Sequence, residues 1–456
     1  GVEIEHKELR FNVTVGDFNL GSKSSISLAN SETPLEFVGL SEGALLFTTR
    51  DGELHVRTIS SKMSLQGDIL LDDSFGGELA VYQREDGLVH AAWSRRTVNA
   101  EGYTLTDIAM TSISAAGKTT AKHYHMQPLK LSEGSYHDFT LDEYEGTMVL
   151  AGYYRDLVTG GSWQDTTSIF VLSSSTPDRG PSWGNAVTVL ANVDISISDA
   201  KPLGVALGAE YLHILYHEYR EDVSGIKRAG LMYTHGEFTE SSWTFQSSVG
   251  DEAGQAKLEV IVVKGEDRLV GAWLEGNGRD TTLVSAVTDS AWSNNMPNRL
   301  LSPGASGVHL EVRSEGVYLF HDEINHYGPV IRWGLVADED GTGVNGLSNM
   351  LVDDVLFGIG IMEEDTLVCS VSETGSYSLY RQASIGSRQD SIDSASLLTI
   401  ILEDPFLWKA TLGISLLLIG VFVAVRRSRS EAEEALLSVD DDESVELMIQ
   451  PESDDG

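Results

Sequence analysis

The stretch that decides the fold reads KPLGVALGAEYLHILYHEYREDVSGIKRAGLMYTHGEFTESSWTFQSSVG, from Lys201 to Gly250. Within it, apolar residues alternate with polar ones in four short runs, separated by turns rich in polar residues and glycine. These runs predict strands at 201–207, 211–216, 229–234 and 243–247. We interpret the stretch as one small antiparallel sheet of the kind that forms the blade of a β-propeller.

Similar hairpins recur along the chain. Their aligned strand ends are Thr49, Tyr82, Tyr153, Tyr216, Trp273, Phe320 and Val371, spaced about 54 residues apart on average. Repetition of a small sheet without helical periodicity predicts an all-β β-propeller of seven blades, each with four antiparallel strands. The spacing is irregular, so six or eight blades remain alternatives, as does a pair of stacked β-sandwiches. The segment Arg10–Val15 is predicted to pair with the last blade and close the ring.

A second kind of segment follows the repeats. FLWKATLGISLLLIGVFVAV, residues 406–425, carries a single charge and as a helix would span about 30 Å, the hydrocarbon thickness of a bilayer. The sequence therefore predicts one C-terminal transmembrane α-helix at 405–425. The residues expected to anchor it are Phe406, Trp408, Lys409, Arg426, Arg427 and Arg429. Because arginines stay on the cytoplasmic side, we expect a single-pass cell (plasma) membrane protein with its N-terminus outside.

Four regions follow from these segments. We predict an extracellular β-propeller at 1–388, a juxtamembrane linker at 389–404, the helix at 405–425 and an acidic cytoplasmic tail at 426–456. The tail has a composition typical of disorder, and a docking role for a cytoplasmic partner is its alternative function. Export of the N-terminal part requires a signal peptide, which we presume has been removed.

The composition also indicates which partners and which type of cell surface to expect. The formal net charge of −38 disfavours nucleic acid as a partner, because phosphate would be repelled. Cys369 is the only cysteine, so no intrachain disulfide can form. Large extracellular domains of animals commonly contain disulfides, and we therefore expect an archaeal or bacterial cell surface.

One resemblance accompanies this pattern. SDAKPLGVALGAEYLHILYHEY, followed by a glycine-rich hairpin and SSWTF, resembles the degenerate blades of sialidase-like surface propellers of archaea and bacteria with a C-terminal helix. The resemblance covers about residues 30–385. No Ser-x-Asp-x-Gly-x-Thr-Trp box, the turn typical of true sialidases, occurs in the chain. The resemblance therefore implies the fold without glycosidase activity, and we predict that the protein is not an enzyme.

The main function predicted is binding or adhesion, with an extracellular glycan or an envelope protein as partner. Loops between second and third strands gather on one face of a propeller, and they are expected to bind the ligand. The predicted ligand-binding residues are Arg155, Trp163, Tyr219, Arg220, Arg279, His326 and Tyr327. Two alternatives remain: a membrane-tethered glycoside hydrolase-like enzyme acting on extracellular polysaccharide, and a structural component of the cell envelope.

No cofactor or catalytic residue is predicted. His123 and His125 share one strand face and could share a metal, but we expect them to be exposed polar strand positions. The string from Asp338 to Gly341 leaves calcium as an alternative, although Asp-Gly is an ordinary turn. Asn12 begins a single glycosylation sequon.

Overall fold

The computed structural model describes residues 20–383 apart from loop segments, of which the longest are 126–132, 158–165 and 175–182. The chain divides into two compact units, Gly1–Gly386 and Ser387–Gly456, and the second lies wholly outside the described residues. The 28 elements of the described residues are all β-strands, which confirms the all-β prediction for this part of the chain.

The strands follow one another closely along the first unit. The first fourteen are β1 (Leu20–Ile26), β2 (Thr33–Leu40), β3 (Gly43–Arg50), β4 (Glu53–Ser60), β5 (Leu65–Asp72), β6 (Phe75–Gln83), β7 (Val89–Val98), β8 (Thr104–Ile113), β9 (His123–His125), β10 (Glu133–Tyr144), β11 (Thr147–Leu157), β12 (Thr166–Ser174), β13 (Val187–Val193) and β14 (Gly204–Leu207). The others are β15 (Leu212–Glu221), β16 (Lys227–Gly236), β17 (Ser247–Gly250), β18 (Ala253–Val263), β19 (Glu266–Glu275), β20 (Thr282–Asp289), β21 (Asn298–Leu301), β22 (Val308–Arg313), β23 (Gly316–Asn325), β24 (Gly328–Asp338), β25 (Asn349–Val352), β26 (Val355–Met362), β27 (Asp365–Val371) and β28 (Tyr377–Ala383).

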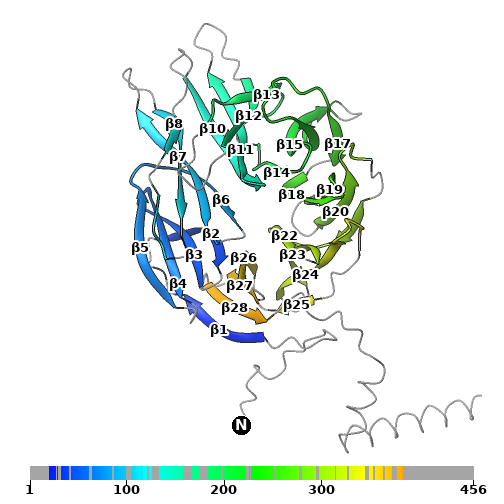
Figure 1. Cartoon of the computed structure of the whole chain (residues 1–456). Coiled ribbons are helices and arrows are strands. Elements are labelled where there is room, and N and C mark those ends of the chain that lie inside the picture. Colours follow the sequence, from blue (N-terminus) through cyan, green and yellow to red (C-terminus); the bar gives the residue numbers. More distant parts are fainter. Residues whose placement is uncertain are drawn as a thin grey trace, which may run out of the picture. The chain divides into compact units, whose positions relative to one another are not determined.

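These strands form four-stranded sheets arranged as a ring (Figure 1). Four sheets each contain consecutive strands: β2–β5, β14–β17, β18–β21 and β22–β25. Strands β6–β13 make one larger sheet, in which β10 joins β8 through a single parallel pair, Ser135 with Thr106. The first strands of successive sheets contact one another from β2 through β6, β10, β14 and β18 to β22. Because β26 contacts β2, β23 and β24, the ring is closed, and the architecture is that of a β-propeller.

The last sheet joins the two ends of the ring. Its order is β1-β28-β27-β26, with β1 antiparallel to β28 and Ile26 opposite Tyr377. An N-terminal strand therefore closes the ring, as the sequence predicted, but it is Leu20–Ile26. The predicted segment 10–15 lies outside the described residues. Pairing β1 with β28 covers an edge that would otherwise be open to other chains.

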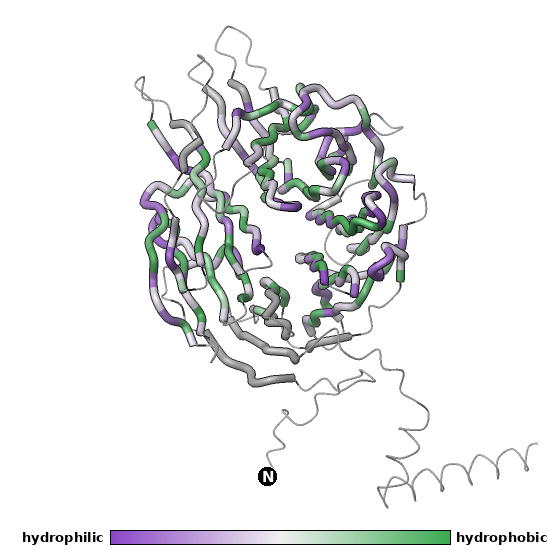
Figure 2. The backbone as a smooth tube through the Cα atoms, in the orientation of Figure 1, coloured by the Kyte–Doolittle hydropathy of each residue, from purple (hydrophilic) through white to green (hydrophobic). Residues whose placement is uncertain are grey.

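Several strands place a large side chain between neighbouring sheets. Tyr216, Trp273 and Phe320 are fully buried on the second strands of their sheets, and fully buried Tyr153 lies on β11, the strand after β10 in the larger sheet. Burial of such a side chain contributes about 1.5–3 kcal/mol to stability. Figure 2 shows hydrophobic stretches running along the strands.

One aligned residue was placed on the wrong strand. Tyr82 lies on β6, the first strand of its sheet, whereas fully buried Trp93 occupies the second strand, β7. Replacing Tyr82 by Trp93 changes the first two intervals from 33 and 71 residues to 44 and 60, so the repeat becomes more even. The error arose because the hairpin of this sheet is formed by its first two strands.

The sheet predicted from residues 201–250 is β14–β17. Its first three strands are confirmed, but the fourth begins at Ser247 instead of residue 243. Trp243 is buried in the loop before that strand, where its indole N–H donates a hydrogen bond to the Glu237 carbonyl oxygen at 3.1 Å. The apolar side chain of Trp243, which led to the prediction of a strand at 243–247, is therefore buried in a loop.

Two-residue turns join several first and second strands, or second and third strands. Both central residues have positive φ at Asp51–Gly52, Glu145–Gly146 and Lys264–Gly265. Positive φ at both positions is the conformation of a type I′ turn, whose twist matches that of antiparallel strands.

Among the described residues, no helix is long and apolar enough to cross a membrane. The segment 405–425, for which the sequence predicts a transmembrane helix, lies outside them, and so do the predicted anchor residues.

Candidate functional site

The innermost strands carry ionisable side chains at alternate positions. We call six of them the axial cluster: Glu36 on β2, Asp142 on β10, Lys257 and Glu259 on β18, and His309 and Glu311 on β22. All six are partly exposed. Residues two apart on a strand point to the same face, so each pair on β18 and β22 shares one side of its strand.

These side chains converge on the ring axis. Lys257 interacts electrostatically with Glu36 and with His309, and Glu259 interacts with Asp142 and Glu311. The strands of Glu36 and Lys257 belong to sheets that are not neighbours in the ring (Figure 1). An interaction between them requires both side chains to face the axis.

Two carboxyl groups of the axial cluster hold a proton near neutral pH. Burial raises the pKa of Glu311 to about 7, although the Arg313 charge opposes the increase. Burial also raises the pKa of Asp142 to about 7, against the hydrogen bond that its Oδ2 accepts from the Leu207 N–H at 2.5 Å. A carboxyl group with this pKa can both donate and accept a proton at neutral pH.

Glu259 lies near both of these groups. Its pKa is raised well above the ordinary value, first by burial and then by the negative charges of Asp142 and Glu311, while Lys257 lowers it. Because like charges disfavour ionisation, Glu259 keeps its proton when Asp142 and Glu311 are ionised.

His309 is uncharged in this setting. Burial lowers its pKa to about 3, and the nearby Lys257 charge adds to the effect. A neutral imidazole offers one donor and one acceptor, so it can bind a polar ligand without charge repulsion.

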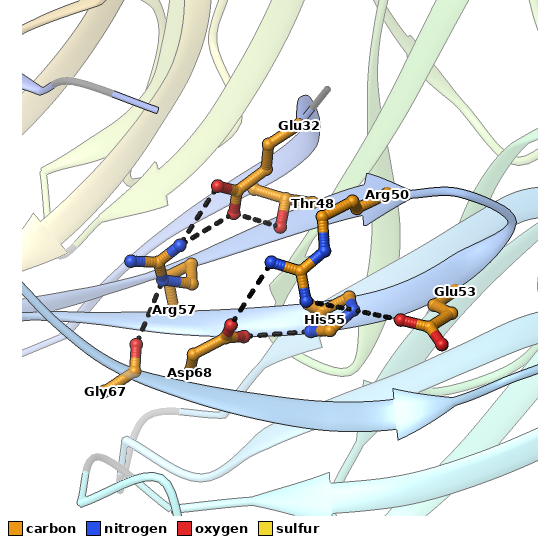
Figure 3. Close-up of polar contacts among 8 residues, drawn as sticks. All are labelled: Glu32, Thr48, Arg50, Glu53, His55, Arg57, Gly67 and Asp68. Carbon is orange, nitrogen blue, oxygen red and sulfur yellow. Dashed lines mark hydrogen bonds and ion pairs between the residues drawn. The ribbon is translucent and has the colours of Figure 1, made fainter. Parts of the chain in front are cut away.

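A polar network in the sheet β2–β5 has a different character (Figure 3). The Arg57 guanidinium donates to both carboxylate oxygens of Glu32 at 3.0 Å, and Glu32 also accepts from Thr48. Nearby, both ring nitrogens of His55 lie within 3.0 Å of carboxylate oxygens, from Glu53 and Asp68. These contacts connect neighbouring strands of one sheet, and we interpret the network as structural.

A buried pair links two neighbouring sheets in a similar way. His213 Nε2 lies 3.0 Å from Asp267 Oδ2, and both side chains are fully buried. Burial would raise the pKa of Asp267, but the hydrogen bonds from His213 and the Ala209 N–H hold it below its ordinary value. His213 Nδ1 also contacts the Tyr233 hydroxyl at 2.8 Å. The pair therefore fastens the sheet β14–β17 to the sheet β18–β21.

Three of the predicted ligand-binding residues lie on described strands. Arg155 is on β11, while Tyr219 and Arg220 are near the end of β15. The Tyr219 hydroxyl donates a hydrogen bond to the Asp199 carboxylate and lies 3.1 Å from the Ser196 hydroxyl oxygen. The remaining predicted residues, Trp163, Arg279, His326 and Tyr327, lie outside the described residues, so the ligand-binding face stays a prediction.

The predicted metal candidates are placed in part. His123 and His125 form the ends of β9, which pairs with β8. Asp338 Oδ1 accepts a hydrogen bond from the Thr342 N–H at 2.7 Å, and Gly341 has a φ of +68°, so this string forms a turn. Within the described ranges, no group of three or more His, Cys, Asp or Glu side chains is suited to a metal ion.

Neither a protein-family model nor a curated protein matches the sequence. Solved structures that resemble the fold include a sialidase from Trypanosoma rangeli, with 10% identity, a TM-score of 0.40, and coverage of 84% of this chain and 62% of that one. An α-L-arabinanase from Penicillium chrysogenum has 12% identity, a TM-score of 0.39, and coverage of 64% and 94%. The polysaccharide lyase Uly1 has 9% identity, a TM-score of 0.42, and coverage of 78% and 91%.

These comparisons correct one prediction. The chain was predicted not to be an enzyme, whereas the solved structures that its fold resembles include a sialidase, an arabinanase, a polysaccharide lyase and a glycosidase. The chain spans about three fifths of the sialidase's own length, and no residue role is carried over at these identities. The archaeal or bacterial origin and the C-terminal anchor stay predictions.

The axial cluster was not among the predicted sites, because the predicted ligand-binding residues were placed in loops. The sequence does contain a pattern that could have indicated the cluster. Ionisable residues occupy alternate positions of otherwise apolar strands, in KLEVIVV from Lys257 and in HLEVR from His309. Such a pattern marks a strand face that is neither core nor open surface, which in a ring of sheets is the face toward the axis.

Proposed function

We propose that this protein is a hydrolase acting on glycosidic bonds of extracellular polysaccharide, with the axial cluster as its reaction centre. The observation that carries the proposal is the meeting of three carboxyl groups of raised pKa on the ring axis, Asp142, Glu259 and Glu311, two of which have a pKa of about 7. Hydrolysis of a glycosidic bond uses one protonated carboxyl group as general acid and a second, ionised one as base or nucleophile.

The axial cluster supplies both forms. Glu259, whose pKa is raised well above the ordinary value, can deliver a proton to the leaving oxygen. Asp142 or Glu311, each with a pKa of about 7, can in its ionised form activate water or attack the sugar. His309, being neutral, can orient a sugar hydroxyl through one hydrogen bond.

The sequence analysis predicted binding or adhesion as the main function and this hydrolase as an alternative. Proton-holding carboxyl groups favour the hydrolase, because binding of a glycan alone needs no general acid. Adhesion stays a prediction, as does the role of an envelope component.

The remaining features of the proposal concern architecture and location. We infer seven blades, with the larger sheet divided between β8 and β10, because only one residue pair joins these two strands. Tethering by residues 405–425, with the tail 426–456 in the cytoplasm, is supported by the length of the apolar run and by the arginines that follow it.

The test uses the full-length protein in detergent micelles with a panel of acidic and neutral extracellular polysaccharides. Release of reducing ends is measured for the wild type and for Glu259→Gln, Glu311→Gln and the exposed control Glu240→Gln. We expect the axial variants to lose activity by about 100-fold or more, and the control to retain it. Wild-type activity should fall as the pH drops below about 7, where Asp142 and Glu311 take up protons.

Two outcomes would contradict the proposal. One is a folded wild-type protein that cleaves none of the polysaccharides. The other is full activity in a folded Glu259→Gln, Glu311→Gln double variant.

A further inference from the structure

A second polar group lies where β6 meets β10, and none of its members belongs to the axial cluster. His137 on β10 places Nδ1 3.0 Å from Glu78 Oε1 on β6. Its other ring nitrogen, Nε2, lies 2.5 Å from the hydroxyl oxygen of Ser135. Ser135 and His137 are two residues apart on one strand, so they project to the same side.

The chemistry of the partners determines where the protons lie. An ionised carboxylate can only accept a hydrogen bond, so His137 donates from Nδ1 to Glu78. In the neutral imidazole, Nε2 is then the acceptor, and the Ser135 hydroxyl must donate to it. This order, from serine to histidine to carboxylate, is the one in which histidine can remove the hydroxyl proton.

A backbone contact also holds the Glu78 carboxylate in position. Its Oε2 accepts a hydrogen bond at 2.7 Å from the backbone N–H of Asp138. Asp138 has a φ of +47°, and the register between β10 and β11 shifts between His137 and Thr140. A bulge with a non-glycine residue in the left-handed region is strained and is maintained only where surrounding contacts hold it.

The group is also open to small molecules. The side chains of His137 and Glu78 are 20% and 28% exposed, and Ser135 is partly exposed. By contrast, the buried pair of His213 and Asp267 has no exposed surface. A reactive serine needs both an adjacent base and access to substrate. Two other serine–histidine contacts among the described residues, Ser112 with His90 and Ser302 with His321, are buried, whereas the group at β6 and β10 offers both.

We propose that Ser135 is a nucleophile and that Ser135, His137 and Glu78 hydrolyse carboxylic esters, a reaction separate from glycosidic cleavage. Ser135 Oγ bonds to the ester carbonyl carbon while its proton moves to His137 Nε2. The alkoxide leaves with that proton, and the acyl group remains on Ser135. Water then gives a proton to His137 and attacks the acyl carbon; Ser135 leaves as the alcohol by taking the proton back, and a carboxylic acid is released.

Glu78 is a positioning residue in this proposal, because it acts through His137. It holds the imidazole in the tautomer that accepts from serine, and it stabilises the imidazolium that forms during attack. The class of substrate is an ester whose acyl group is small enough to reach a partly exposed serine, such as an O-acyl substituent of a glycan.

The test treats the full-length protein in detergent micelles with a fluorophosphonate probe, which reacts with nucleophilic serines. Peptide mass spectrometry of the wild type should place the adduct on Ser135. We expect Ser135→Ala to abolish the adduct and His137→Gln to slow labelling by about 100-fold or more. Ser168→Ala, a partly exposed serine on β12, serves as the matched control and should label as the wild type does.

The role of Glu78 is tested by the rate at which the probe labels Ser135 in folded Glu78 variants. Glu78→Gln should slow labelling by about 10-fold or more and Glu78→Asp should restore part of the rate. Melting curves of both variants check that each is folded at the temperature of labelling. Absence of an adduct on Ser135 in the folded wild type would overturn the proposal, and so would undiminished labelling in His137→Gln. The labelling needs no glycan, so its outcome is independent of the polysaccharide assay.

Discussion

At the residue scale, the molecule concentrates carboxyl groups of raised pKa on one axis. In the folded protein Glu311 has a pKa of about 7, against 4.5 without the fold. A raised pKa means that the folded state binds the proton more tightly than the unfolded chain. The stabilising contribution is therefore complete below about pH 4.5 and is lost as the pH rises through 7.

Glu311→Gln should consequently raise the melting temperature at pH 8, where the wild type holds a buried negative charge. The gain corresponds to at most about 3 kcal/mol and should disappear as the pH falls toward 4.5. Thermal unfolding of both proteins between pH 4.5 and 8 measures it, with exposed Glu240→Gln as the control. A constant difference across this pH range would show that Glu311 titrates as it does in the unfolded chain.

Asp267 presents the opposite case, since its pKa is held low by hydrogen bonds from His213 and from backbone N–H groups. Asp267→Ala leaves a buried histidine and three backbone donors without their acceptor, and should cost about 3–5 kcal/mol of stability. Chemical denaturation monitored by tryptophan fluorescence measures the loss, and Asp340→Ala, in an exposed turn, is the control. Equal stability of the two variants would remove the structural role assigned to the pair.

The sequence alone could indicate that these residues were unusual, but not which of them meet. Alternation on β18 shows that Lys257 and Glu259 share a face, yet a period of two does not reveal which face points toward the axis. The meeting of Glu36 with Lys257 depends on the closure of the whole ring. Ser135 and His137 could be seen as a pair, whereas Glu78 comes from another sheet.

At the element scale, strands and hairpins were predicted well because local alternation and turn residues determine them. Most second strands were identified from one buried aromatic each, such as Tyr216 or Phe320. The failure at Tyr82 has a physical cause: both strands of that hairpin are apolar, so alternation alone does not separate the first strand from the second. An N-terminal closing strand was predicted, but at 10–15 instead of Leu20–Ile26, because its partner β28 is distant in sequence and local alternation does not fix the pairing.

Closure by β1 can be tested with a designed disulfide. Ser25 lies directly opposite Ser378, and opposed strand residues are within the range of Cα separations that a disulfide bridges. The Ser25→Cys, Ser378→Cys variant should form an intrachain bond, visible as faster migration in a non-reducing gel, and should melt at a higher temperature than its reduced form. Cys369 is buried and should not compete.

A matched variant pairs Ser25→Cys with Thr366→Cys, because Thr366 lies opposite Gln382 and not opposite β1. This variant should stay reduced. Equal crosslinking in the two variants would mean that β1 does not hold the register described.

At the scale of the whole molecule, the net charge of −38 opposes folding through self-repulsion. Salt screens such repulsion, with a Debye length that falls from about 10 Å at 0.1 M to about 3 Å at 1 M. Raising KCl from 0.1 to 1 M should therefore increase the melting temperature by about 2–5 °C. Differential scanning calorimetry provides the measurement, with sucrose of equal osmolality as the control. A lower melting temperature at 1 M would show that attractive ion pairs, such as Arg57 with Glu32, outweigh the repulsion.

The sheet that unites β1 with β26, β27 and β28 has a consequence for biosynthesis. Ribosomes deliver β1 first, yet its partner appears only after more than three hundred further residues. Throughout that interval the nascent chain carries an unpaired edge and cannot complete its last sheet. Folding of this protein should therefore finish slowly and only after synthesis is nearly complete. A chain that ends before Tyr377 lacks β28, the strand with which β1 pairs.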